Sequence, residues 1–233
     1  MPTAPFSPAI ATSTKILAFL ACAPADRASV QATLLHAIVA TRSPEVMAEF
    51  WVALPPDTLG ASPQGQSRLD AYDFVLEFTG TPAVHDAFAG MTWPAPIDSQ
   101  RSAVFAGTEY CIVPGRGEVA LFCPLIRRAH LGPAQFQHYW LHEHARFGRD
   151  NPHNGYCQVH PAALPSTDRV TASALPHAPF DGVAEAYFVD LPAMLKRLNS
   201  PEIAGDAYAD EQRFIDHARS SFLPFERGGI AAR

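Results

Sequence analysis

Apolar and polar residues alternate along the chain in an order of elements that occurs twice: strand, helix, strand, strand, helix, strand. In the first round, Val30, Leu34 and Ile38 stand at helical spacing, and the neighbouring segments are alternating or continuous apolar runs of strand length. We therefore expect strands over 15–22, 46–54, 72–78 and 103–113, and helices over 29–40 and 82–91.

The second round repeats this order. Its pattern predicts strands over 119–126, 156–160, 183–189 and 222–225, and helices over 133–147, 191–199 and 201–209. Pro114-Gly115-Arg116-Gly117 separates the two rounds and is typical of a loop. The expected organisation is a flexible N-terminal tail over 1–13, rich in Pro, Ala, Ser and Thr, followed by two halves over 14–113 and 118–230.

This order of elements is the ferredoxin-like arrangement, an antiparallel sheet with both helices on one face. Such a unit leaves its other face uncovered, and that face has to be buried against a second layer. Two units in one chain can bury these faces against each other. The predicted fold class is therefore α+β, with two βαββαβ units packed sheet to sheet and a pocket in the space between the sheets.

The composition of the 233 residues indicates a globular chain, since 48% are hydrophobic and 17% are charged. A net charge of −6 without any Lys/Arg run argues against nucleic acid as a partner. No apolar run reaches the roughly 18 residues of a transmembrane helix, so no membrane partner is expected. The four cysteines show no C-x-x-C spacing, which favours a reducing compartment, and we expect the cytoplasm.

The apolar run 16–23, which follows Lys15, has two interpretations. It is either a short signal-peptide core or lipoprotein cleavage site ending in Ala-Cys-Ala, or a buried first strand that ends at Pro24. The run is at the lower length limit for a signal, and Leu20 stands where a small residue would precede Ala21. We favour the buried strand.

Histidines gather in the second half, where eight of the ten lie between His130 and His217. Histidine is the side chain whose ordinary pKa lies nearest neutrality, which suits proton transfer or metal ligation. Phe136, Trp140 and His144 form one stripe of the expected helix over 133–147. The two aromatic residues are typical of a core, whereas His144 is a candidate for catalysis or ligand contact.

Two neighbouring strands add polar side chains. Alternation puts Tyr156, Gln158 and His160 on one face of their strand and Cys157 and Val159 on the other. We expect Cys157 and Val159 to face the helices and the polar three to face the pocket. By the same alternation, the strand over 183–189 turns Glu185 and Tyr187 towards the pocket, where a few polar groups in an apolar cavity are typical of a small-molecule site.

Other chemistry has less support. His138 and His142 are four residues apart on one helix face and form a possible metal clamp, but they lie on its polar side, and we interpret them as a solvated pair. No G-x-S-x-G, P-loop or G-x-G-x-x-G motif occurs. We therefore expect no metal and no cofactor.

Five motifs of the second half follow one another in order: Arg127-Arg128, Phe136-x-x-x-Trp140-x-x-x-His144, Tyr156-Cys157-Gln158-Val159-His160, Phe180-Asp181-Gly182-Val183-Ala184-Glu185 and Asp210-Glu211-x-Arg213-Phe214-Ile215-Asp216. Over residues 118–228 this set resembles the EthD family of the dimeric α/β-barrel superfamily. Residues 14–113 show the topology without the motifs and are expected to be a diverged second half. Because single-domain members of the family form the barrel by dimerising, the resemblance implies that the duplication forms it here within one chain.

The resemblance makes His144, His160 and Asp181 the candidate catalytic residues, since they fall on the family's helix histidine, strand-end histidine and Asp-Gly positions. Ala145-Arg146-Phe147 departs from the Ala-Pro-Leu-like residues usual after the helix histidine, so we expect a different pocket rim. Superfamily relatives include cofactor-free muconolactone isomerases, polyketide cyclases and dehydratases, and small monooxygenases. That range identifies a scaffold better than a reaction.

The leading hypothesis is a cofactor-independent lyase, isomerase or cyclase that acts on a small cyclic or polyketide-like carbonyl compound, such as an organic acid or lactone. His144 or His160 would take a proton next to the carbonyl, and an enolate would form. The expected substrate-binding residues are Tyr139, Trp140, Gln158, Glu185, Tyr187 and Trp51, of which Tyr139, Tyr187 or Gln158 would hydrogen-bond the enolate. The alternatives are a non-catalytic binding protein that serves an oxygenase pathway and a haem- or metal-dependent monooxygenase.

Only the second half carries these histidines, so we expect one pocket per chain on that side. Trp51 would supply an apolar wall, and Glu49 or Glu77 would favour the charged form of a nearby imidazole. The expected assembly is either a monomer with a pseudo-two-fold barrel or a homodimer, and its expected partner is a small organic ligand.

Overall fold

The computed structural model describes residues 10–40, 43–55, 57–60, 72–91, 93–94, 96–150, 154–161 and 175–230. Eight strands make up its sheet: β1 (Ala11–Leu20), β2 (Val46–Ala53), β3 (Phe74–Gly80), β4 (Ala103–Val113), β5 (Val119–Leu125), β6 (Gly155–Pro161), β7 (Gly182–Phe188) and β8 (Leu223–Ile230). The segment between the strands expected over 46–54 and 72–78 lies partly outside the described residues.

The first half contributes a 3₁₀ turn, η1 (Pro24–Asp26), and the helices α1 (Arg27–Ala40) and α2 (Val84–Ala89). The second half contributes α3 (Pro133–Tyr139), the π-helical turn η3 (Trp140–His144), α4 (Arg146–Arg149), α6 (Leu191–Leu198), the π-helical segment η4 (Pro201–Ala207) and α7 (Tyr208–Glu211). None of the described helices is long and apolar enough to cross a membrane.

The strands close into one antiparallel barrel in the order β1-β3-β2-β8-β5-β7-β6-β4. Each half supplies four neighbouring strands in the ferredoxin-like order, β4-β1-β3-β2 and β8-β5-β7-β6. The halves meet at two seams, where β2 pairs with β8 and β4 pairs with β6. The predicted α+β fold, an intrachain dimeric α/β barrel, is confirmed. Closure leaves none of the eight strands a free edge for pairing with another chain.

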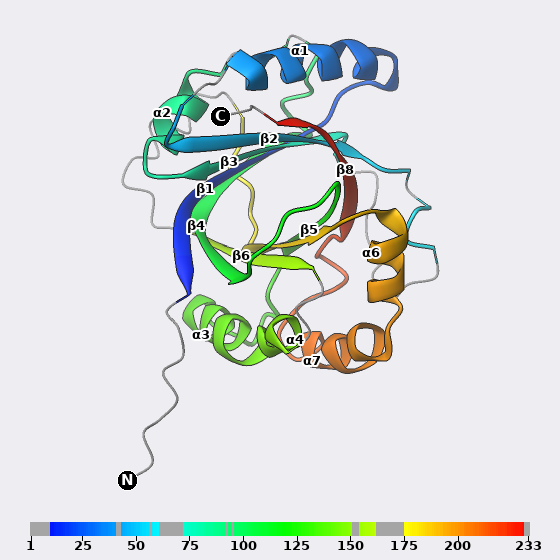
Figure 1. Ribbon diagram of the computed structural model, residues 1–233. Coiled ribbons are helices and arrows are strands. Elements are labelled where there is room, and N and C mark those ends of the chain that lie inside the picture. Colours follow the sequence, from blue (N-terminus) through cyan, green and yellow to red (C-terminus); the bar gives the residue numbers. More distant parts are fainter. Residues whose placement is uncertain are drawn as a thin grey trace.

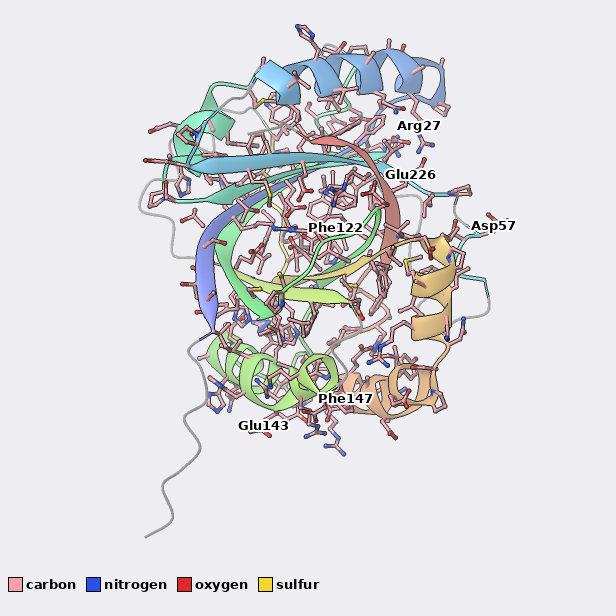
Figure 2. All side chains as sticks on the ribbon, viewed as in Figure 1. Arg27, Asp57, Phe122, Glu143, Phe147 and Glu226 are labelled. Carbon is pink, nitrogen blue, oxygen red and sulfur yellow. The ribbon has the colours of Figure 1, made fainter. Side chains whose placement is uncertain are left out.

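Helices cover the barrel on two sides (Figure 1). The helices of the first half pack on one side, where Val30, Leu34 and Ile38 of α1 are buried against the sheet, as their spacing predicts. Those of the second half lie over the opposite part of the barrel. Phe122 lies inside the barrel, whereas Glu143 points away from it on the outer side of the helices (Figure 2).

The space between the sheets is filled, which corrects the expected position of the pocket. Phe19, Trp51, Phe122 and Tyr187 project into it, and none is more than 1% exposed. Their rings contact one another with centroids 5.7–6.4 Å apart. Each four-stranded half of the barrel therefore has one face against its helices and the other inside the barrel.

The first five residues of the apolar run after Lys15 form the second half of β1, as the strand interpretation predicts. The strand begins at Ala11 and so takes in residues 11–13, which we expected in the tail. The helix expected over 133–147 is present as α3, η3 and α4, with a π-helical turn in its middle. Its stripe is buried, since Phe136, Trp140 and His144 are at most 8% exposed.

Candidate functional site

A cavity of about 120 Å³ lies between the sheet of the second half and the helices that cover it. Its walls are mostly apolar and come from β5, β7 and the helices; they include Leu121, Leu125, Trp140, Phe147, Ala184, Ala186, Phe188, Leu198, Ile203 and Phe222. The volume is close to the roughly 150 Å³ of an engineered apolar protein cavity that binds benzene. The space therefore suits a single small ring.

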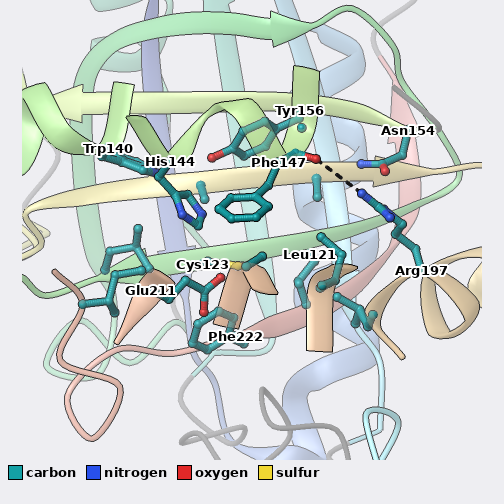
Figure 3. Close-up of a pocket in the computed structure, with 18 of the residues that line it drawn as sticks. Leu121, Cys123, Trp140, His144, Phe147, Asn154, Tyr156, Arg197, Glu211 and Phe222 are labelled. Carbon is teal, nitrogen blue, oxygen red and sulfur yellow. Dashed lines mark hydrogen bonds between the residues drawn. The ribbon is translucent and has the colours of Figure 1, made fainter. Parts of the chain in front are cut away.

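Polar groups reach the cavity at a few points only. His144 and Arg197 lie at opposite ends of it, with Phe147 between them and the Tyr156 ring above (Figure 3). Asn154 lies beside Arg197, and Glu211 lies near the His144 end. A mostly apolar cavity with a few separated polar groups is the usual design of a small-molecule site.

His144 ends the π-helical turn η3, which widens the helix at the cavity. The backbone N–H of Ala145 donates to the Trp140 carbonyl five residues earlier, at 3.1 Å. The Gln158 side chain from β6 donates a second hydrogen bond to the same carbonyl, also at 3.1 Å. Single π-turns inserted into helices are frequent at functional sites, and this one is fixed from the sheet by Gln158.

Asp210 of α7 holds the imidazole of His144. Its Oδ2 lies 2.9 Å from His144 Nδ1, and its Oδ1 accepts a hydrogen bond of 2.7 Å from the Tyr139 hydroxyl. Burial alone would raise the pKa of Asp210, but the hydrogen bonds from His144 and Tyr139 hold it below its usual value. An ionised carboxylate at Nδ1 favours the tautomer with its proton there, and leaves Nε2 as an acceptor.

The described residues give His144 Nε2 no hydrogen-bond partner, and the imidazole lines the cavity. Asp210 is therefore a site residue that the sequence reasoning missed. Its motif, Asp210-Glu211-x-Arg213, was part of the resemblance, but nothing in the sequence showed that it would pair with His144. Tyr156 was expected to face a pocket between the sheets, but it lines the cavity on the helix side instead.

His160 and Gln158 face the helices and not the barrel interior, so the expected orientation of this strand is wrong. Cys157 pairs with Glu185 across β6 and β7, and side chains opposite each other on neighbouring strands share a face. Cys157 and Val159 therefore point into the barrel, where they join its apolar core. The error arose because both faces of the strand are buried, so the apolar residues do not mark the helix side.

His160 lies behind Trp140 and does not line the cavity. Its ring stacks on the indole, with centroids 4.7 Å apart and planes 5° apart, and its Nε2 lies 3.0 Å from Gln158 Oε1. Burial, with a smaller effect from His142, lowers the pKa of His160 to about 4. The structure thus brings His144 to the cavity and leaves His160 as a support for Trp140 and Gln158.

Asp181 also lies outside the cavity lining. Its carboxylate accepts a hydrogen bond of 2.9 Å from the backbone of Arg127 and lies 3.4 Å from the Arg127 guanidinium. Its backbone N–H donates to the Leu125 carbonyl at 2.8 Å. These contacts join the end of β5 to the start of β7. Tyr139 likewise contacts Asp210 from outside the lining, whereas Trp140 is part of the cavity wall.

Glu185, Tyr187 and Trp51 face the barrel interior, together with Glu77 and Glu49. Tyr187 donates to Glu185 at 2.7 Å and to Glu77 at 3.0 Å, and the Trp51 indole donates to Glu77 at 2.9 Å. These five side chains therefore take part in a buried network of charges, and the expected substrate contacts are absent from the cavity lining. No imidazole among the described residues lies beside Glu49 or Glu77, contrary to expectation.

Lys15 lies at the centre of this network and is fully buried. Its ammonium group pairs with Glu77 at 2.5 Å, with Glu185 at 2.8 Å, and with Glu109. Arg116 adds a second cation 2.6 Å from Glu77 and stacks over the Tyr187 ring. A buried charge of this kind is tolerated only when it is paired and hydrogen-bonded.

Two groups of described residues have metal-ligand chemistry. Candidate ligand atoms of Glu109, Cys157 and Glu185 lie within 4.8 Å of one another in the barrel. The Lys15 ammonium already pairs with both carboxylates, so a metal ion would have to compete with it. His138 and His142 are exposed, with ring centroids 4.6 Å apart, as expected of a solvated pair.

A second, more open cleft of about 650 Å³ adjoins the cavity. Asn154, Phe188 and Arg197 line both spaces, so they form the boundary between them. The cleft also contains Arg116, Lys196 and Glu202, and its lining is about as polar as it is apolar. Both spaces lie against the second half.

Several solved structures share the whole fold with this chain. An anthrone oxidase-like protein aligns with a TM-score of 0.59 at 9% identity, covering 95% of this chain and 94% of that chain. A candidate monooxygenase from Fusobacterium nucleatum aligns with a TM-score of 0.54 at 6% identity, covering 95% and 94%. A heme-binding protein from Thermus thermophilus aligns with a TM-score of 0.50 at 10% identity, covering 94% and 93%. At such identities the likeness concerns the fold alone.

Haem does not fit either space as the described residues form it. The cavity at His144 is smaller than the roughly 300–1,000 Å³ of pockets that hold drug-sized ligands, and a porphyrin has four rings. The described residues that line the larger cleft include no His, Cys or Met, and the hydroxyl of its Tyr187 is already bonded to Glu185 and Glu77.

No curated protein matches the sequence. The EthD domain matches residues 128–218, which contain α3, η3, β6, β7 and α7. This range includes His144, Asp210, Tyr156 and Arg197, and the barrel around it has the same fold as the anthrone oxidase-like protein. Over residues 128–218, the second half of this chain is thus similar to the EthD domain, as its motifs predicted.

Proposed function

We propose that the cavity beside His144 is the active site of a cofactor-independent lyase, isomerase or cyclase that acts on a small cyclic carbonyl compound. The observation that carries this proposal is the imidazole itself. The Asp210 carboxylate lies 2.9 Å from Nδ1 of His144. The other ring nitrogen, Nε2, is therefore available as a base in the wall of an apolar cavity that is large enough for one ring. A histidine oriented by a buried carboxylate is a recurring arrangement for proton transfer.

The reaction step is proton abstraction from the carbon next to a carbonyl. His144 Nε2 takes the proton, and the electron pair of the C–H bond moves to form an enolate. The imidazolium that results is stabilised by the Asp210 carboxylate. It returns the proton to another carbon in an isomerisation, or to a leaving group in an elimination. General acid–base catalysis of this kind contributes about 10²–10⁴-fold.

Tyr156 is the donor to the enolate oxygen in this proposal. Its hydroxyl accepts a hydrogen bond of 2.9 Å from Gln158, which leaves its own proton for a ligand. Burial raises the pKa of Tyr156, so the phenol stays protonated. This role replaces the one expected for Tyr139, Tyr187 and Gln158, none of which lines the cavity.

Solvent exchange provides the test, since it needs no knowledge of the final product. Cyclic ketones and lactones would be incubated with the protein in D₂O, and deuterium uptake next to the carbonyl followed by NMR. We expect protein-dependent exchange that falls about 100-fold or more in His144→Gln. His138→Gln, which changes an exposed histidine of the preceding helix turn, should keep the full rate.

Equal rates in His144→Gln and the unaltered protein would overturn the role of His144. Tight ligand binding without any exchange would favour instead a binding protein that serves another enzyme, which the apolar walls of the cavity also suit.

A further inference from the structure

Arg197 lies at the boundary between the cavity and the open cleft, at the end of the cavity opposite His144 (Figure 3). It belongs to the last turn of α6, whose start is fixed by Asp190, which accepts a hydrogen bond of 2.8 Å from the Ala193 backbone. Its side chain is only 11% exposed. A rigid helix thus holds a nearly buried cation beside the cavity.

The contacts of this guanidinium within the described residues are long. It lies 3.3 Å from Ser200 Oγ, 3.4 Å from the Phe147 carbonyl and 3.8 Å from Glu202. Charge-assisted hydrogen bonds of arginine are usually about 2.7–2.9 Å. Burial lowers the pKa of Arg197, and the attraction of Glu202 offsets this only in part. Within the described part of the chain, the charge therefore lacks a close anionic partner.

The other arginine that lines these spaces, Arg116, already has one, since it pairs with Glu77 at 2.6 Å. The contrast indicates that Arg197 has capacity for a bidentate anion, the geometry that arginine recognises best.

The charged side chains of the cavity also favour one orientation of an anionic ligand. Glu211 lines the cavity near His144, and its carboxylate lies 2.9 Å from His217. A ligand carboxylate at that end would face a carboxylate of the protein, whereas at the Arg197 end it faces a cation. That end also adjoins the open polar cleft, where an anion keeps part of its hydration.

From this arrangement we infer that the ligands are ring-bearing carboxylates, whose ring fills the cavity beside Phe147 and whose carboxylate binds Arg197. This deepens the proposed function, on which it rests for the statement that the reacting end of the ring lies towards His144. The substrate class is thereby narrowed from small cyclic carbonyl compounds to those with a short acidic side chain.

Matched pairs of probes test this inference by binding alone. Phenylacetate and 3-phenylpropionate would be compared by calorimetry with their uncharged amides, which have nearly the same shape. In the unaltered protein, we expect at least one carboxylate to bind at submillimolar concentration and about tenfold or more tightly than its amide. Arg197→Gln should weaken carboxylate binding about tenfold and leave amide binding within about twofold, with Arg197→Lys in between.

Arg219→Gln is the control, because it removes one positive charge from an exposed position that lines neither space. It should leave the preference for the carboxylate unchanged. Equal affinity for carboxylate and amide, or no binding of any probe at millimolar concentration, would overturn the inference. So would an equal loss of both ligands in Arg197→Gln, since that is the result of a merely structural role.

The outcome is separable from that of the proposed function. His144→Gln should keep the preference for the carboxylate, because binding at Arg197 does not use the base. If exchange by His144 fails while the preference persists, the catalytic proposal is wrong and the carboxylate site stands. If exchange succeeds without the preference, only the carboxylate site is wrong.

Discussion

Asp210 binds two side chains that lie 66 and 71 residues earlier in the sequence. It is 3% exposed and contacts His144 and Tyr139 directly, while Arg146 and Arg213 approach it at 3.6 and 3.4 Å. The two arginines are exposed, so their contribution is weakened by solvent. At the scale of single residues, the orientation of the base therefore depends on one carboxylate from α7.

Asp210→Asn should reduce the exchange rate about 100-fold or more, while the ligands bind nearly as before. Asparagine can donate a proton to Nδ1, which favours the tautomer whose Nε2 is already protonated and unable to act as a base. The measurement is deuterium exchange together with calorimetry. Asp206→Asn, at an exposed position of η4, should be indistinguishable from the unaltered protein. A full rate in Asp210→Asn would show that the carboxylate is dispensable.

At the scale of elements, β7 and the π-helical turn η3 pack closely against each other where Gly182 meets Trp140. A Cβ atom on Gly182 would lie 2.4 Å from Cζ3 of Trp140 and 3.2 Å from the Val159 carbonyl. Trp140 is also held by the stacked ring of His160. The absence of a side chain at Gly182 therefore sets the position of a cavity wall.

Gly182→Ala should lower the free energy of unfolding by about 1–3 kcal/mol, because Trp140 has to move against a packed neighbour. It should also weaken binding of ring ligands, since the displaced indole lines the cavity. Urea unfolding and calorimetry would measure the two effects. Gly205→Ala is the matched control: nothing lies within 4 Å of its added Cβ, so it should be neutral or slightly stabilising. Similar results for the two variants would contradict the proposed contact.

The elements also show what the sequence could and could not predict. The duplicated order of strands and helices predicted the barrel, because the spacing of apolar residues reports periodicity directly. It could not say which face of β6 lies inside, because Tyr156, Gln158 and His160 are covered by helices while Cys157 and Val159 are covered by the opposite sheet. When both faces of a strand are buried, alternation shows which residues share a face but not which face lies inside the barrel.

The position of the cavity and the partner of His144 depend on how the whole chain packs, so the sequence pattern could not predict them. The expected pocket between the sheets is occupied by a network that includes Lys15, a residue read from the sequence only as the start of an apolar run. The cavity lies instead on the helix side, where His144 was placed correctly on the buried stripe. Its partner Asp210 is 66 residues away, and no local spacing could reveal that contact.

At the scale of the whole molecule, the buried network joins the two halves of the barrel. Lys15, Glu77 and Glu109 come from the first half, and Glu185 and Tyr187 come from the second. Within the described interior, the four carboxylates of Glu49, Glu77, Glu109 and Glu185 face three cations, Lys15, Arg116 and Arg227. One negative charge is thus uncompensated by a cation.

A bound proton can supply the missing charge. Burial, with help from Glu77, raises the pKa of Glu49 and of Glu185 to about 7, although nearby cations oppose the shift. Glu77 differs, because Arg116 and Lys15 overcome the effect of burial and lower its pKa to about 2. Oε1 of Glu185 is buried and has no hydrogen-bond partner among the described residues, which is consistent with a carboxyl group that holds a proton.

Glu185→Gln tests this proton through the pH dependence of stability. The pKa of Glu185 is about 7 in the folded protein against an ordinary 4.5, so the folded state binds the proton more tightly. The resulting stabilisation is complete below pH 4.5 and is lost as the pH rises through 7. Glutamine does not titrate. Between pH 5 and pH 8, the free energy of unfolding of the variant should therefore rise by about 2–3 kcal/mol relative to that of the unaltered protein, as measured by urea unfolding.

His160, with its pKa lowered to about 4, has the opposite dependence between pH 4 and 6.5, but it is common to both proteins and cancels in the difference. Glu226→Gln, at an exposed position of β8, should show no such gain, and an equally flat difference for Glu185→Gln would mean that Glu185 is ionised throughout this range.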